Sequence, residues 1–210
     1  MSLPRFYPIL DAQAFAARGC SLEIAAAAVI EAGAGILQIR RKAGWTREDF
    51  AEAERIAVLC QAAGAQLVIN DRADIAALLK AGVHVGQDDL APAVARRLVG
   101  PDAMLGYSTH NASQLLAGDA EPVTYLALGP IFATASKENP DPVVGLDELA
   151  RLLPLNRRPL VAIGGITRQN ARAVLNAGAN SVAVIGDLLP ETVTPVAVRQ
   201  RIDEWLRLVG

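Results

Sequence analysis

The sequence predicts an α/β fold, a single-domain (β/α)8 barrel (TIM barrel) spanning residues 1–210. Eight short apolar runs alternate with longer helix-like segments, and a helix–glycine–strand junction recurs along the chain. Hydrophobic residues make up 52% of the chain and aromatic residues only 4%, which favours helices packed on β-branched strands. Eight such units in 210 residues fit a compact barrel, and no change in composition marks a second domain.

The eight apolar runs are the predicted strands. Most are rich in Val, Ile or Leu, as strands of a buried parallel sheet are, and the fifth is the weakest. An open doubly wound sheet would place a glycine-rich turn after the first strand, where this chain has Leu10-Asp11-Ala12-Gln13. The runs are Phe6–Leu10, Gly35–Arg40, Gln66–Asn70, Val83–Val85, Ala103–Gly106, Thr124–Leu128, Leu160–Ile163 and Ser181–Ile185.

Helix boundaries are predicted between these runs. Thr46 precedes Arg47-Glu48-Asp49, a pattern that resembles a capping box, and Asn111 and Thr167 are residues that favour helix N-caps. A glycine in the left-handed conformation commonly ends a helix, and the long polar loop 137–145 is a candidate lid over the site. Four junctions lead from a helix into a strand through such a glycine: Gly33, Gly64, Gly82 and Gly178.

Composition also limits the partners and the compartment. The net charge is −2, so no strong global field attracts nucleic acid or an anionic membrane. The most apolar helix-like stretch, Leu22–Ala34, is too short to span a bilayer, and the first residues lack the pattern of a signal peptide. Cys20 and Cys60 lack metal-ligand spacing and fit packed thiols in a reducing cytosol. We expect a cytoplasmic protein, and the sequence leaves a homo-oligomer open.

Polar residues follow the predicted strands at their C-terminal ends, where barrels carry their active sites. Because side chains alternate along a strand, Gln38, Arg40 and Lys42 share one side, and Arg41 points the other way, toward the helices. Two cations and an amide on one strand end predict an anion-binding site. The alternative is a solvated basic strand end.

Carboxylates follow the third and fourth strands. Asp71 and Asp89 lie after neighbouring strands and are candidates to share one Mg²⁺, which takes one or two carboxylates and completes its shell with water and phosphate. Asp88 competes with Asp89 for this role, and Asn70 has the alternative role of a helix cap. His84 lies within a strand and is predicted to pack in the core rather than to bind a ligand.

The later loops carry candidates for substrate and phosphate binding. Ser108 is a candidate to bind a substrate edge or is a plain loop serine, and His110 is either an acid–base group or a residue that orients its loop. The stretch 134–137 follows a glycine–proline turn and suits phosphate, or is an ordinary solvated loop. Gly164-Gly165 offers backbone N–H groups, and the loops after strands seven and eight form the usual phosphate site of the fold.

Taken in order, these motifs resemble the thiamine phosphate synthase family over nearly the full chain. The family fold is a (β/α)8 barrel, in agreement with the pattern of strands and helices. Seven ordered motifs make the resemblance specific. The matching segments are Gln38–Lys42, Ile69–Arg72, Val83–Asp89, Gly106–His110, Gly129–Lys137, Ala162–Ile166 and Val184–Ile185.

The resemblance implies that a hydroxymethylpyrimidine diphosphate is joined to a thiazole phosphate, with release of pyrophosphate, through a dissociative, carbocation-like step. It implies Mg²⁺ bound by Asp71 and Asp89, and Arg40, Lys42 and Lys137 as the groups that stabilise the leaving pyrophosphate. The substrate-binding residues that it implies are Gln38, Ile39, Arg40, Arg41, Lys42, Asn70, Ser108, Thr134, Ala135, Ser136, Lys137, Gly165, Ile185 and Gly186.

The chain departs from the family pattern at two places. An acidic residue is usual at the position of Arg41, and a Ser-Ala pair is usual where this chain has Gly186-Asp187. The second departure removes a hydroxyl group and adds negative charge beside the expected thiazole phosphate. Two alternatives are a thiazole tautomerase-like isomerase that uses His110, and a non-catalytic barrel that binds a phosphate ligand. The isomerase needs no diphosphate site, whereas this chain has a full set of residues for one.

Overall fold

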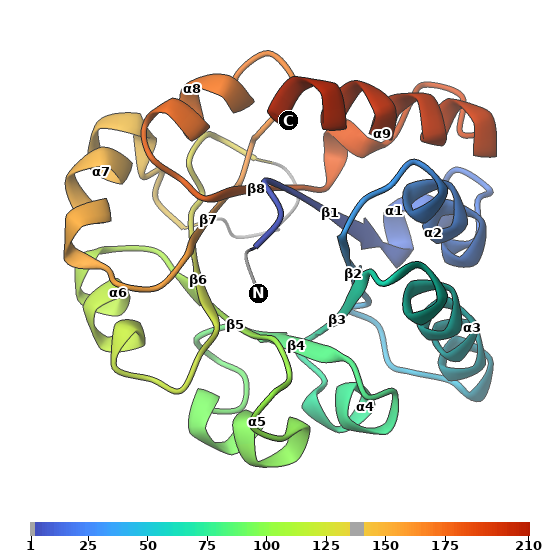
Figure 1. The fold of residues 1–210 in the computed structure, drawn as a ribbon, viewed down its shortest axis with the longest axis horizontal. Coiled ribbons are helices and arrows are strands. Elements are labelled where there is room, and N and C mark those ends of the chain that lie inside the picture. The colour runs from blue at the N-terminus through green and yellow to red at the C-terminus, as the bar shows by residue number, and fades with distance from the viewer. Residues whose placement is uncertain (1–2, 135–140) are drawn as a thin grey trace.

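The computed structural model describes residues 3–134 and 141–210. Eight parallel strands pair in chain order and close into one barrel, with the last strand against the first. The strands form an inner ring and the helices lie outside it (Figure 1). The predicted (β/α)8 barrel is confirmed. The strands are β1 (Phe6–Asp11), β2 (Ile36–Arg40), β3 (Gln66–Asn70), β4 (Gly82–Val85), β5 (Leu105–Thr109), β6 (Tyr125–Leu128), β7 (Leu160–Ile163) and β8 (Ser181–Val184).

Helices follow or precede each strand on the outer face. Short 3₁₀ turns, η1 (Leu153–Leu155) and η2 (Gly186–Leu188), accompany them. No helix among the described residues is long and apolar enough to cross a membrane. The α-helices are α1 (Ala12–Ala16), α2 (Leu22–Glu31), α3 (Arg47–Ala63), α4 (Ala73–Leu78), α5 (Pro92–Val99), α6 (Ala112–Asp119), α7 (Gly145–Leu152), α8 (Ala171–Asn176) and α9 (Pro195–Val209).

Alternation along the strands divides the core into two clusters. Ile36 belongs to a small apolar cluster inside the barrel, whereas its neighbours Leu37 and Ile39 belong to the large cluster between the sheet and the helices. Successive residues of a strand point to opposite faces of the sheet. The same alternation therefore directs the polar residues of β2 either into the barrel or out toward the helices.

Two predicted helix caps are confirmed. The Thr46 side chain accepts from the backbone N–H of Asp49, and the Asp49 side chain accepts from the N–H of Thr46, which completes a capping box at α3. Asn111 caps α6 by accepting from Gln114 N. Gly64 ends α3 in the left-handed conformation, with φ at 69°.

Two other predicted boundaries are wrong. Asn170, not Thr167, is the N-cap of α8, because the Thr167 N–H donates to the Asn170 side chain and the turn continues to that residue. Gly82 lies within β4, and Lys80 takes the left-handed conformation there, with φ at 53°. A Cβ at Gly82 would lie 2.7 Å from the Met104 carbonyl oxygen, so this glycine permits the close approach of β4 and the residue before β5.

The fifth strand is displaced from the predicted Ala103–Gly106 to Leu105–Thr109. Its last three residues, Tyr107 to Thr109, pair with β6, although their polarity predicts a loop. The Thr109 hydroxyl is buried and donates to the Ala127 carbonyl oxygen at 2.9 Å. The acceptor for this hydroxyl lies on the neighbouring strand β6. The hydropathy of the residues around Thr109 does not indicate that such an acceptor exists.

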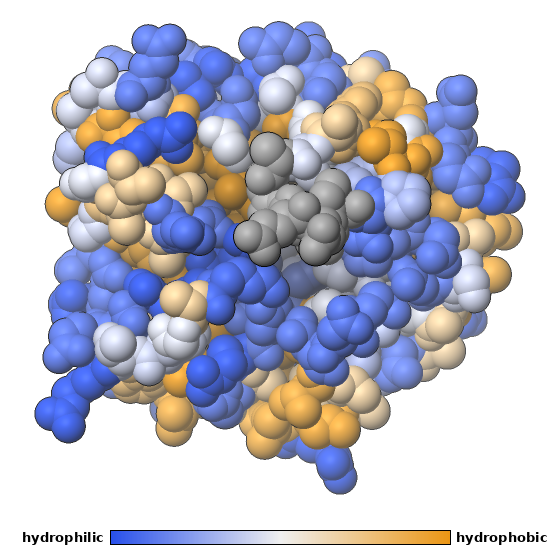
Figure 2. All heavy atoms as spheres, turned by 180° about the vertical axis from the view of Figure 1, so that it is seen from behind, coloured by the Kyte–Doolittle hydropathy of each residue, from blue (hydrophilic) through white to orange (hydrophobic). Residues whose placement is uncertain are grey.

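The strands run away from the viewer in Figure 1, so Figure 2, seen from behind, shows the face where they end. Hydrophilic residues gather around the middle of this face (Figure 2). Barrel enzymes carry their chemistry at this end of the strands.

Candidate active site

One cavity of about 960 Å³ lies at the C-terminal ends of the strands and takes residues from all eight of them. The structure brings most of the predicted site residues together around it. Ile39 and Arg41 do not line it, and Ala135, Ser136 and Lys137 lie outside the described residues. The predicted residues that line the cavity are Gln38, Arg40, Lys42, Asn70, Asp71, Asp89, Ser108, Thr134, Gly165, Ile185 and Gly186.

Arg40 is held in place by a carboxylate that the sequence motifs do not include. Asp11, the last residue of β1, accepts from the N–H of Ala14 at 2.9 Å and so caps α1. Its second oxygen forms an ion pair with Arg40 Nη1. Asp11 lies directly after an apolar run and directly before a helix, and this position is the signal by which the sequence reveals it.

Lys42 and the two predicted metal ligands lie next to one another. Lys42 Nζ donates to Asp71 Oδ2 at 2.6 Å. Burial raises the pKa of Asp71, Lys42 opposes that rise and the neighbouring Asp89 carboxyl adds to it. Asp71 has a left-handed backbone, with φ at 64°, and its N–H donates to the His84 carbonyl oxygen at 2.8 Å. This unusual conformation in a non-glycine residue, which costs of order 1 kcal/mol or more, directs a carboxylate into the cavity.

The arrangement around Asp71 and Asp89 fits Mg²⁺. The two carboxyl groups are neighbours beside a cation, and hard oxygen ligands of this kind suit the ion. Among residues 3–134 and 141–210, no group of three or more His, Cys, Asp or Glu side chains is placed to hold a metal. Two carboxylates suffice for Mg²⁺, because water and substrate phosphate usually supply its other ligands. Asp88 lines the cavity as well.

Asn70 adds a buried donor to the same end of the cavity. The residue is 7% exposed, and its Nδ2 has no hydrogen-bond partner among the residues that the structure describes. A buried donor without a partner costs about 1–3 kcal/mol. An anion bound beside it would supply the missing acceptor.

His110 connects two of the loops at the cavity. Its Nδ1 lies 2.6 Å from the Gly129 carbonyl oxygen, and its Nε2 lies 3.5 Å from Asp141 Oδ2. These contacts favour the loop-orienting role over the acid–base role. Asp141, from the predicted lid 137–145, lines the cavity, whereas residues 137–140 of that stretch lie outside the described residues.

The loop after β7 packs tightly against the turn that follows β6. Gly165 has a left-handed backbone, with φ at 63°, and a Cβ there would lie 2.5 Å from the Ala133 carbonyl oxygen. Both the conformation and the close approach require glycine. The two loops thereby form one wall of the cavity, beside Thr134.

The negative charge of Asp187 is balanced by two arginines. Asp187 Oδ2 accepts from Arg168 Nε at 2.9 Å and from the Arg168 N–H at 3.3 Å. Arg201 Nη1 donates to the Asp187 carbonyl oxygen at 2.8 Å and lies 4.0 Å from its carboxylate. The carboxylate therefore joins the loops after β7 and β8. The cations beside it offset the charge that the sequence placed near the expected phosphate.

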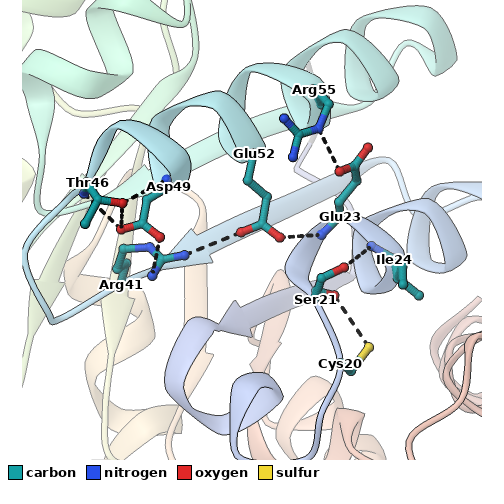
Figure 3. Close-up of polar contacts among 9 residues, drawn as sticks. All are labelled: Cys20, Ser21, Glu23, Ile24, Arg41, Thr46, Asp49, Glu52 and Arg55. Atoms are coloured by element: carbon teal, nitrogen blue, oxygen red, sulfur yellow. Dashed lines mark hydrogen bonds and ion pairs between the residues drawn. The ribbon is translucent and has the colours of Figure 1, made fainter.

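Arg41 lies on the outer side of the barrel, as alternation predicts (Figure 3). Its guanidinium group pairs with Asp49 at 2.9 Å and with Glu52 at 3.5 Å, both on α3. It also lies 5.8 Å from the centre of the Trp45 ring. Arg41 therefore attaches α3 to the end of β2, and its place in a substrate-binding motif does not bring it to the cavity.

A chain of hydrogen-bonded polar side chains crosses the barrel interior and lines the cavity. Gln38 Nε2 donates to Tyr7 Oη at 2.9 Å, and Tyr7 Oη lies 2.9 Å from Tyr125 Oη. His84 lies 3.0 Å from Tyr125 Oη through Nδ1 and 2.9 Å from Ser108 Oγ through Nε2. His84 is buried, as predicted, and also lines the cavity. The sequence motifs include neither tyrosine. Strand alternation places Tyr7 on the same face of β1 as Ile9, which is the face that lines the cavity.

Comparisons with known proteins identify the family of this chain. The family model for thiamine monophosphate synthase matches residues 6–188. The chain belongs to this family. A thiamine-phosphate synthase of Koribacter versatilis is 49% identical over 212 residues, which cover 100% of this chain and 97% of that protein. One of Chloroflexus aurantiacus is 41% identical over 93% of this chain and 90% of that protein.

A solved structure agrees with the family. A thiamine phosphate pyrophosphorylase from Pyrococcus furiosus superposes with a TM-score of 0.83 at 27% identity, over 98% of this chain and 95% of that one. Membership in the thiamine monophosphate synthase family assigns the chain thiamine-phosphate synthase activity, that of a transferase in thiamine biosynthesis that acts on small molecules.

Proposed function

We propose that the protein joins a hydroxymethylpyrimidine diphosphate to a thiazole phosphate, in a dissociative step that requires Mg²⁺. One observation carries this proposal. A single cavity combines a pair of neighbouring carboxylates with Arg40 and Lys42 at one end, and with the glycine loops after β7 and β8 at the other. A diphosphate and a phosphate monoester thus have separate places in one cavity.

The diphosphate end suits a leaving group that gains negative charge. As the bond between the pyrimidine methylene and the diphosphate breaks, charge develops on the departing oxygen. Arg40 and Lys42 are positioned beforehand by Asp11 and Asp71, and such prearranged charges stabilise a transition state without reorganisation. By the family resemblance Lys137 adds a third cation. Mg²⁺ held by Asp71 and Asp89 would neutralise the diphosphate further.

The other product of bond breaking is a cation on the pyrimidine methylene. An electron-rich aminopyrimidine delocalises this positive charge, and the thiazole nitrogen then forms the new carbon–nitrogen bond. Atoms and charge balance without a covalent intermediate on the protein, so no nucleophilic side chain is needed. The residues that bind both substrates contribute by holding the thiazole nitrogen against the methylene carbon, and such positioning accounts for much of an enzymatic rate.

A direct assay tests this function. The purified protein, both substrates and Mg²⁺ are expected to give equal amounts of pyrophosphate and thiamine phosphate, and excess chelator is expected to abolish both. Asp71→Asn should lower kcat/KM by about 100-fold or more, because it removes a charged ligand. Asp74→Asn is the matched control, since Asp74 pairs with Arg72 on the exposed side of α4.

Two results would contradict the proposal. Full turnover in chelator would remove the metal from the reaction. Isomerisation of a thiazole phosphate, with no pyrophosphate released when both substrates are present, would identify a tautomerase-like enzyme instead.

A further inference from the structure

The buried chain of hydrogen bonds has a direction, which follows from counting protons. Gln38 Nε2 carries only protons, so it donates to Tyr7 Oη. Gln38 and Tyr125 are the partners that the described residues give to Tyr7 Oη. The single hydroxyl proton of Tyr7 therefore points to Tyr125, because a fully buried donor left without an acceptor is costly.

The same count of protons continues to Ser108, at the other end of the hydrogen-bond chain. Tyr125 accepts from Tyr7, so its own proton points to His84 Nδ1. Burial holds the pKa of Tyr7 and of Tyr125 far above the usual range of a phenol, so both keep that proton. The Nδ1 of His84 is then an acceptor, and the proton of the neutral ring is on Nε2. Nε2 donates to Ser108 Oγ, which leaves the Ser108 hydroxyl proton to point into the cavity.

The two ends of this hydrogen-bond chain therefore present opposite groups to a ligand. Gln38 on β2 has its amide oxygen left as an acceptor, and Ser108 on β5 has its hydroxyl left as a donor. Both residues line the cavity. Reversing one end requires reversal of all the bonds between them, including a flip of the Gln38 amide and a change of the His84 tautomer.

We propose that Tyr7, Tyr125 and His84 are positioning residues that fix this polarity, so that the cavity selects a ring edge with an amino group beside a ring nitrogen. The proposal rests on the proposed function. An aminopyrimidine edge offers an N–H donor for Gln38 and a ring nitrogen acceptor for Ser108. The corresponding oxopyrimidine offers a carbonyl oxygen and a ring N–H, which is the reverse pattern at both ends.

Close packing holds the atoms of this hydrogen-bond chain in place. A Cβ at Gly106 would lie 2.3 Å from Tyr125 Oη and 2.4 Å from His84 Nδ1, so only glycine leaves room for this contact. The His84 and Tyr125 rings stack, with centroids 5.6 Å apart and planes 22° apart. Tyr7 packs edge-on against Tyr125 with centroids 5.9 Å apart. The oxygen and nitrogen atoms are thus held at hydrogen-bond distance by close-packed rings.

The His84 tautomer is measured directly by NMR of protein labelled with ¹⁵N at histidine. The chain has 2 histidines, and the His110→Gln variant assigns their signals. At neutral pH we expect His84 with the proton on Nε2 and Nδ1 unprotonated. In Tyr125→Phe, which removes the hydroxyl that donates to Nδ1, we expect a mixture of tautomers. This measurement on the free protein requires no turnover.

Selectivity is measured with the amino- and oxopyrimidine diphosphates. We expect calorimetric affinity and kcat/KM to favour the amino compound by at least about 1,000-fold, as in other sites built around hydrogen bonds to the substrate. Tyr125→Phe and Tyr7→Phe should each lower that ratio by about tenfold or more, with little change in KM for thiazole phosphate. Tyr107→Phe is the matched control, because Tyr107 packs against the outer core and its hydroxyl contacts Gln87, which is not part of the Gln38–Ser108 chain.

The outcomes separate this proposal from the proposed function. A protein that forms thiamine phosphate but carries the His84 proton on Nδ1, or that does not distinguish the two diphosphates, overturns the polarity proposal. A protein with the expected tautomer and preference that forms no thiamine phosphate contradicts the proposed function alone. A Tyr125→Phe variant that folds and keeps the full preference removes Tyr125 from the positioning role, and Tyr7→Phe repeats the test at the other tyrosine.

Discussion

At the scale of single residues, the cations of the cavity depend on carboxylates. Asp11 serves two purposes at once, since one oxygen caps α1 and the other holds Arg40. Lys42 forms an ion pair with Asp71, one of the two proposed metal ligands. A long basic side chain loses much rotational freedom when it binds an anion. A carboxylate that holds it beforehand reduces that loss when the substrate arrives.

Substitution of Asp11 separates its two purposes. Asn caps helices as well as Asp does, so Asp11→Asn should leave Tm within about 2 °C. The neutral amide no longer holds Arg40 by charge, so we expect kcat/KM for the pyrimidine diphosphate to fall about tenfold. Asp11→Ala should lower both quantities. An unchanged kcat/KM in Asp11→Asn, together with a fall in Tm in Asp11→Ala alone, would show that Asp11 acts only as a cap.

At the scale of an element, Arg41 shows how a binding motif is divided between two faces of a strand. β2 directs Gln38 and Arg40 into the barrel, whereas Arg41 joins Asp49 and Glu52 on α3 (Figure 3). Where the family usually has an acid, a guanidinium group connects this strand to its helix. The side chain at this position therefore attaches the helix to the strand and does not line the cavity.

Arg41→Met tests this assignment, because Met keeps an apolar stem against Trp45 and loses the ion pairs. We expect Tm to fall by about 2–4 °C, which corresponds to about 1 kcal/mol in a chain of this size. KM for both substrates should stay within about twofold of the original values. Arg40→Met is the matched change on the inner face and should raise KM for the diphosphate. A KM increase in Arg41→Met would place Arg41 in substrate binding after all.

At the scale of the whole molecule, the two halves of the barrel provide different parts of the cavity. Arg40, Lys42, Asp71 and Asp89 come from β2 to β4 and the residues after them, whereas the glycine loops follow β7 and β8. The pairing of β8 with β1 brings the two ends of the chain together. A change in one half should therefore affect one substrate and leave the other.

Gly186→Ser tests this division. A Cβ at Gly186 meets nothing within 4 Å and its φ lies outside the left-handed region, so serine fits without strain. A hydroxyl bonded to a charged phosphate contributes about 1.5 kcal/mol, and we expect about tenfold tighter binding of thiazole phosphate in calorimetric titration. KM for the pyrimidine diphosphate should not change. Unchanged thiazole-phosphate affinity would mean that the missing hydroxyl has no consequence.

The sequence by itself determined the barrel and the inner face of β2. Both follow from local periodicity. The spacing of apolar residues predicts the succession of strands and helices, and the alternation of side chains along a strand places Arg40 and Arg41 on opposite faces. The order of polar motifs at the strand ends predicted Gln38, Arg40, Asn70 and most of the other predicted residues that line the cavity. These features need only knowledge of neighbours along the chain.

Tertiary structure alone decided the partners of those residues. The charge of Asp187 is balanced by Arg168 and Arg201, which lie 19 and 14 positions away, so the sequence shows the acid without the cations that neutralise it. The polar end of β5 is a strand that pairs with β6, where the Ala127 carbonyl oxygen accepts from the Thr109 hydroxyl. The direction of hydrogen bonds from Gln38 to Ser108 depends on five strands meeting in one interior. A hydrogen bond needs both its atoms in place, and only the closed barrel brings them together.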